Sequence, residues 1–196
     1  MNLRLASFIS FVLNPLFILV FLPFFLVYKS TADVALGLWW TGYTFLFLML
    51  LAAFTVYAVK RGIFTDLDVS RRDQRPIAFS FALVLAAIYI AGLYLFRSPV
   101  VLKVIAIGVT IGIVVLSLVN TRIKASIHIA TFSGLLMGLA LGYGGYFFVL
   151  FLLIPILGQA RISLKRHTPR EIVTGGLLGT LISLGIYSFL RFLLYR

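Results

Sequence analysis

The chain has 196 residues, of which 62% are hydrophobic and only 11% are charged. Its mean hydropathy of +1.14 lies far above the range of soluble domains and excludes a separate soluble domain. In a soluble protein, the net charge of +12 would indicate binding to nucleic acid. In so apolar a chain it indicates contact with anionic lipid headgroups or with phosphate, and we expect no nucleic-acid partner. Because the chain contains no cysteine, disulfides and thiolate chemistry are excluded.

Apolar runs follow one another along the chain, and about 20 apolar residues cross the hydrocarbon core of a bilayer. The predicted spans are residues 5–28, 36–59, 77–97, 99–120, 128–143, 145–160 and 171–194. We read the first as a span and not as a cleaved signal, because no small-residue cleavage site follows it. The sequence therefore predicts an all-α integral membrane protein, a bundle of about six to seven transmembrane helices that forms a single membrane domain over residues 1–196.

The fifth and sixth spans are short, and together they form one apolar stretch. The residues Gly142-Tyr143-Gly144-Gly145 interrupt it. Glycine supplies the backbone freedom that a tight turn needs, so we expect a helical hairpin that turns here.

The connections between the spans are of two kinds. Three are short and carry little charge, and three are rich in charge: KRGIFTDLDVSRRDQRP (60–76), TRIKASIH (121–128) and ARISLKRHTPRE (160–171). If the spans alternate in direction, these three polar segments converge on one membrane face. They contain both histidines of the chain and four of its five acids. Ionisable groups at membrane depth are costly and usually mark a functional site.

Such a set of residues suits phosphate chemistry. Arginines from different loops can surround a phosphoryl group, because guanidinium donors are planar and bind oxygens in pairs. Two histidines can then divide the reaction, one attacking phosphorus and the other protonating the leaving oxygen. We expect no metal or other cofactor, since two histidines with scattered acids make a poor metal site.

Three motifs carry a resemblance to a known family. They are Arg75-Pro76, Ser126-x-His128 and Arg161-x5-His167-x3-Glu171. Their order resembles the type 2 phosphatidic acid phosphatase superfamily, whose pattern is K-x6-R-P, then P-S-G-H, then S-R-x5-H-x3-D. The third motif is the most specific. The resemblance covers about residues 60–180 and leaves out the first two spans.

The resemblance implies a metal-independent membrane lipid phosphatase. In that scheme His167 is the nucleophile that forms a phosphohistidine, Glu171 orients its imidazole, and His128 is the general acid. The phosphate would be held by Arg72, Arg75, Arg161 and Ser126, with Arg71 and Lys124 as further cations. The chain departs from the family pattern where Asp68 replaces the lysine, Ala125 and Ile127 replace proline and glycine, Ala160 replaces serine and Glu171 replaces aspartate.

Some of these residues also have a structural interpretation. The run Thr168-Pro169-Arg170-Glu171 is typical of a capping box, with threonine at the N-cap and glutamate at the third helical position. Glu171 could then cap the last helix and orient His167 as well. Glycines at helical spacing predict close helix packing, namely Gly134, Gly138, Gly142, Gly175, Gly176 and Gly179.

The sequence thus favours a hydrolase of the cell membrane that removes phosphate from a lipid phosphate monoester or pyrophosphate, either phosphatidic-acid-like or polyprenyl. Its expected partners are this substrate and the membrane lipids. Two alternatives stay open, a small anion transporter and a catalytically inactive relative that binds lipid phosphates. A phosphotransferase, which passes the phosphoryl group to an acceptor other than water, is a variant of the phosphatase hypothesis. The distribution of basic residues and the usual orientation of the resembled family disagree on the side that the site faces.

Overall fold

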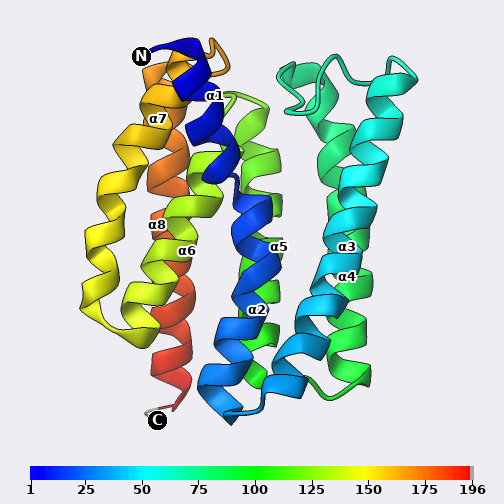
Figure 1. Cartoon of the computed structure of the whole chain (residues 1–196), viewed down its shortest axis with the longest axis vertical. Coiled ribbons are helices and arrows are strands. Elements are labelled where there is room, and N and C mark those ends of the chain that lie inside the picture. Colours follow the sequence, from blue (N-terminus) through cyan, green and yellow to red (C-terminus); the bar gives the residue numbers. More distant parts are fainter. Residues whose placement is uncertain (195–196) are drawn as a thin grey trace. The chain divides into compact units, whose positions relative to one another are not determined.

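The computed structural model describes residues 1–194, and every regular element among them is helical (Figure 1). In chain order the elements are α1 (Leu3–Val12), α2 (Pro15–Thr31), α3 (Val34–Lys60), the short 3-10 helix η1 (Arg72–Gln74), α4 (Arg75–Leu95), α5 (Val100–Asn120), α6 (Ile127–Tyr143), the 3-10 helix η2 (Gly145–Leu152), α7 (Leu153–Ser163) and α8 (Pro169–Leu194).

The helices match the predicted spans. Within the described residues, six helical stretches are long and apolar enough to cross a membrane: Leu3–Thr31, Val34–Lys60, Arg72–Leu95, Val100–Asn120, Gly145–Ser163 and Pro169–Phe192. The seventh predicted span is α6, an apolar helix of 17 residues at the short end of the lengths that cross a bilayer. The prediction of an all-α bundle of six to seven helices is confirmed, and the protein is a multi-pass membrane protein.

The first predicted span is present, but it is interrupted. Helix α1 ends at Val12 and α2 begins at Pro15. Proline has no backbone N–H to continue the hydrogen-bond ladder, and its ring disfavours helical backbone at the preceding Asn14. The span predicted over residues 5–28 is thus present as the stretch Leu3–Thr31, with a break between its two helices at Leu13 and Asn14.

The chain divides into two compact units, and each is described by itself. We call residues 1–15 and 118–196 the histidine unit, and residues 16–117 the arginine-loop unit. The expected single membrane domain over residues 1–196 stays a prediction, and residues 195 and 196 lie outside the described part of the chain.

In the histidine unit, α6 and α8 lie side by side, and α1 packs against α7 (Figure 1). Glycines allow the close approach of α6 and α8. A Cβ atom on Gly175 would stand 2.6 Å from the carbonyl oxygen of Ser126, and one on Gly134 would stand 3.1 Å from that of Gly179. A Cβ atom on Gly179 would overlap the carbonyl oxygen of Ala130. The helix-packing role predicted for these glycines is confirmed.

The hairpin also forms where the glycines predict it. Helix α6 ends at Tyr143, and Gly144 has a φ of +135°, which L side chains rarely adopt. The chain then returns through η2 into α7. By contrast, a Cβ atom on Gly142 would meet nothing within 4 Å, so the packing contact predicted for this glycine was wrong.

We expect Gly175→Ala to destabilise the histidine unit. The added methyl would overlap the backbone of Ser126 and push α6 and α8 apart, and overpacking of this kind costs about 1–3 kcal/mol. The measurement is the thermal unfolding midpoint of the purified protein in detergent. Gly185→Ala is the matched control on the same helix, because its Cβ atom would meet nothing within 4 Å. Equal midpoints for the two variants would contradict the tight contact.

Candidate functional site

The centre of the candidate site is a hydrogen-bonded pair at the start of α8. His167 precedes the helix and Glu171 lies in its first turn, so that Nδ1 of His167 stands 2.8 Å from Oε2 of Glu171. The same oxygen accepts a hydrogen bond from the backbone N–H of Thr168 at 3.2 Å. The N–H of Glu171 in turn donates to Oγ1 of Thr168 at 3.4 Å. The capping box and the contact with the imidazole, both expected from the sequence, are present together.

This pair determines which nitrogen of His167 can react. A carboxylate can only accept hydrogen bonds, so this contact favours the tautomer of His167 with the proton on Nδ1 and the lone pair on Nε2. The His167 side chain is 3% exposed and that of Glu171 18% exposed, so the protein, and not water, sets the orientation of the ring. The arrangement can present a nucleophilic or basic nitrogen.

The second charged segment meets the third at this point. Nζ of Lys124 donates to the carbonyl oxygen of Arg166 at 2.9 Å and lies 4.0 Å from Oε2 of Glu171. The backbone N–H of Ser126 donates to the carbonyl oxygen of Glu171 at 3.1 Å. Two of the three polar segments predicted to converge therefore do so within the histidine unit.

Ser126 and His128 lie where α6 begins. Ser126 is fully buried and is the N-cap of the helix, with its hydroxyl accepting from the N–H of Ile129 at 3.5 Å. His128 is the second residue of α6 and its Nε2 atom is buried. Through the bond between Ser126 and Glu171, the N-termini of α6 and α8 lie beside each other. Helix N-termini carry partial positive charge and favour anions. The phosphate contact expected of Ser126 stays a prediction.

Arg161 lies near the end of α7 and is 2% exposed. Its guanidinium donates to the hydroxyl of Ser10, in α1, at 2.9 Å. Helix α1 lies outside the motifs that carry the family resemblance, so Ser10 was not predicted as a partner of Arg161. The only signal for it was the presence of two hydroxyls, Ser7 and Ser10, in an otherwise apolar run.

We expect Ser10→Ala to lower the stability of the histidine unit. The change removes a hydrogen bond from a buried guanidinium, and a bond to a charged group contributes about 1.5–3 kcal/mol. The thermal unfolding midpoint should fall, while that of Ser7→Ala should not, because no hydrogen bond of the Ser7 side chain is found within residues 1–194. An unchanged midpoint for Ser10→Ala would show that the contact with Arg161 contributes little.

The three other predicted phosphate ligands belong to the arginine-loop unit. Arg75 begins α4, is 2% exposed, and donates from Nε to the carbonyl oxygen of Val69 at 3.2 Å. Arg71 is exposed and paired with Asp73, its NH2 group lying 2.8 Å from Oδ2. Arg72 begins η1. Whether these arginines share a site with the histidines stays a prediction.

The segment before these arginines is folded and not a loose linker. Phe64 is buried and packs with Ala58 and Val69. Asp66 accepts from the backbone N–H of Asp68 at 3.0 Å and from the hydroxyl of Ser70 at 3.0 Å. One of the four acids of the polar segments is thus engaged in holding this loop.

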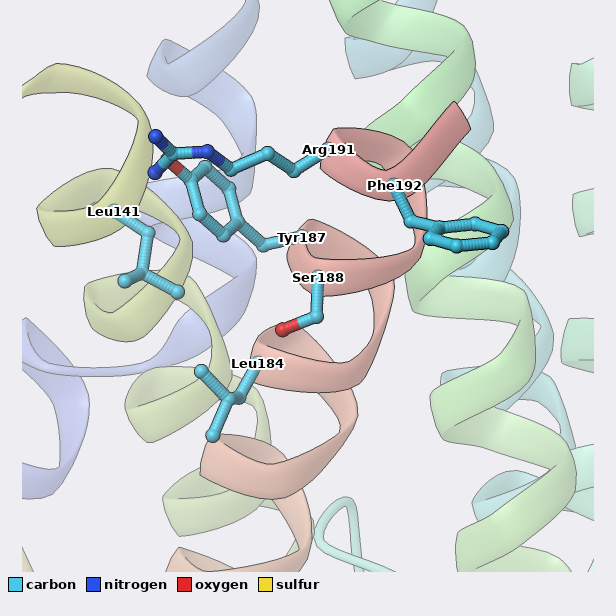
Figure 2. A pocket seen from close by; sticks show the side chains of 6 residues that line it. All are labelled: Leu141, Leu184, Tyr187, Ser188, Arg191 and Phe192. Atoms are coloured by element: carbon cyan, nitrogen blue, oxygen red, sulfur yellow. The ribbon is translucent and has the colours of Figure 1, made fainter. Parts of the chain in front are cut away.

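A hollow of the histidine unit lies away from the candidate site. Figure 2 shows it along the C-terminal half of α8, lined by Leu141, Leu184, Tyr187, Ser188, Arg191 and Phe192. At about 1.5 Å of rise per residue, roughly 24 Å of helix separates Tyr187 from Glu171. The hollow therefore contains none of the residues predicted for phosphate chemistry.

No family model, no curated protein and no solved structure matches the chain. The resemblance to the type 2 phosphatidic acid phosphatase superfamily therefore rests on the three motifs alone and stays a prediction.

Proposed function

We propose that the protein is a phosphatase of the cell membrane that hydrolyses a lipid phosphate monoester or pyrophosphate without a metal. The observation that carries this proposal is the hydrogen-bonded pair of buried His167 and half-buried Glu171 at the N-terminus of α8, beside the N-terminus of α6 that bears His128. The pair supplies an oriented imidazole nitrogen, and two helix N-termini together with Lys124 supply positive potential for a phosphate.

The proposed reaction has two steps. In the first, Nε2 of His167 attacks phosphorus, and the bond from phosphorus to the lipid oxygen breaks while protonated His128 gives its proton to that oxygen. In the second, water attacks the phosphohistidine and gives a proton to His128, and the N–P bond breaks to release inorganic phosphate. Glu171 holds the Nδ1 proton of His167 and offsets the positive charge that the ring gains on phosphorylation.

The cations have a distinct role in this scheme. Arg72, Arg75 and Arg161 would bind the oxygens of the phosphate, as in the family that the motifs resemble, with Arg71, Lys124 and Ser126 as further ligands. Guanidinium groups suit this task because they contact two oxygens at once and stabilise the charge that develops in the transition state.

The test is release of inorganic phosphate by the purified protein from phosphatidic acid, polyprenyl phosphates and polyprenyl pyrophosphates in mixed micelles with EDTA. Release that continues in EDTA and is lost in the histidine variants described below supports the proposal and ranks the substrates. Saturable binding of these lipids without any release would instead identify an inactive lipid-phosphate-binding protein. If the protein neither bound these lipids nor released phosphate from them, the phosphatase and the lipid-binding hypotheses would both be contradicted.

A further inference from the structure

A groove in the histidine unit lies apart from the proposed reaction, between the beginning of α1 and the end of α7. It has a volume of about 590 Å³ and is lined by Leu3, Arg4, Ser7, Ser163, Leu164 and Lys165. Helix α1 begins the apolar stretch Leu3–Thr31 and α7 ends the stretch Gly145–Ser163. Because spans end at the membrane surface, we expect the groove at the level of the lipid headgroups.

The polar groups of this groove are not engaged elsewhere. Arg4 and Lys165 are exposed, and within the described residues 1–194 neither side chain has an ion-pair or hydrogen-bond partner. The hydroxyls of Ser7 and Ser163 likewise have no partner in that part of the chain. Two cations and two hydroxyl donors, from α1, the end of α7 and the turn that follows it, therefore face one hollow.

The charge of the surroundings favours an anion. The sequence of the histidine unit contains one acidic residue, Glu171, and that carboxylate is bound to His167. No acid lines the groove. Arg4 and Ser7 also belong to the first two turns of α1, where the helix dipole is positive.

We infer that this groove binds an anionic phospholipid of the surrounding bilayer by its phosphate group, at a site separate from that of the proposed phosphatase reaction. Arg4 and Lys165 contact the phosphate oxygens, and the hydroxyls of Ser7 and Ser163 donate to them. The side chains of Leu3 and Leu164 contact the first methylenes of the acyl chains.

A lipid at this position also bears on Arg161. Ser7 and Ser10 lie about one turn apart on α1, and Ser10 accepts the hydrogen bond of the buried Arg161 guanidinium. A phospholipid held by both α1 and the end of α7 therefore stabilises the packing of these helices, and with it the contact between Ser10 and Arg161.

The experiment is native mass spectrometry of the full-length protein, released from detergent micelles and titrated with phosphatidylglycerol or phosphatidylcholine. The His167→Ala background removes any turnover, and phosphatidylglycerol is a diester outside the proposed substrate class. We expect one phosphatidylglycerol to bind at least about 10-fold more tightly than phosphatidylcholine. Arg4→Gln combined with Lys165→Gln should weaken this binding about 30-fold, and an excess of inorganic phosphate should not displace the lipid.

The matched control is Lys29→Gln combined with Lys60→Gln, which removes the same charge from two exposed lysines outside the groove. It should leave the binding unchanged. Equal weakening in both double variants, or no preference for phosphatidylglycerol in the parent protein, would overturn the inference. Displacement by inorganic phosphate would overturn the assignment to a phospholipid and show a site for the free anion instead. Because binding is measured without turnover, failure of the proposed phosphatase activity would leave this result standing.

Discussion

Replacing His167 by alanine is expected to abolish phosphate release, down to the level of a blank without protein. The change removes the nitrogen that attacks phosphorus, and His128 is already assigned the separate role of general acid. The measurement is the initial rate of inorganic phosphate release from the best lipid substrate. His167→Asn is the companion variant, because its amide can still donate a hydrogen bond and keeps most of the buried volume.

His128→Ala provides the internal comparison. A general acid contributes about 10²–10⁴ in rate, so this variant should be slow but measurable with the same substrate. Both variants should elute as the parent protein does and keep its thermal unfolding midpoint within a few degrees. Phosphate release that persists in well-folded His167→Asn would exclude this histidine as the nucleophile.

Glu171→Gln is expected to separate the two roles of Glu171. The amide oxygen of glutamine can still accept from the N–H of Thr168, so the cap of α8 is retained and the unfolding midpoint should change little. The negative charge that offsets the phosphorylated imidazole is lost, however, so we expect kcat to fall by about 10²–10³. Glu171→Ala should lose both the activity and part of the stability.

Thr168→Ala is the matched control for the structural role. It removes the hydroxyl that accepts from the N–H of Glu171, and loss of an N-cap costs about 1 kcal/mol. Its unfolding midpoint should fall while kcat stays within about twofold of the parent. If Glu171→Gln kept full activity, the carboxylate would be a helix cap and nothing more.

Features that depend on residues close in sequence were predictable. The capping box and the His167–Glu171 contact follow from spacings of three and four residues, which the geometry of one helical turn brings together. The turn at Gly144 follows from the backbone freedom of glycine, and the spans follow from runs of apolar residues long enough for a bilayer.

Contacts between distant residues were not predictable in this way. Ser10 and Arg161 are 151 positions apart, and nothing in the local pattern of either residue specifies the other. The hydrogen bond from Lys124 to the carbonyl oxygen of Arg166 was not predictable either, because it depends on how two loops fold against each other. The break at Asn14 did have a local cause in Pro15, but the high hydropathy on both sides of it favoured a continuous span.

The most direct test of the proposed mechanism is to trap the covalent intermediate. The purified protein would be mixed with a lipid phosphate carrying a radioactive phosphoryl group, quenched in base and digested, and the labelled peptide would be identified by mass spectrometry. We predict an acid-labile, base-stable label on His167, present in the parent protein and absent from His167→Asn. Steady release of phosphate without such a label, or a label on any other residue, would contradict a phosphohistidine at His167.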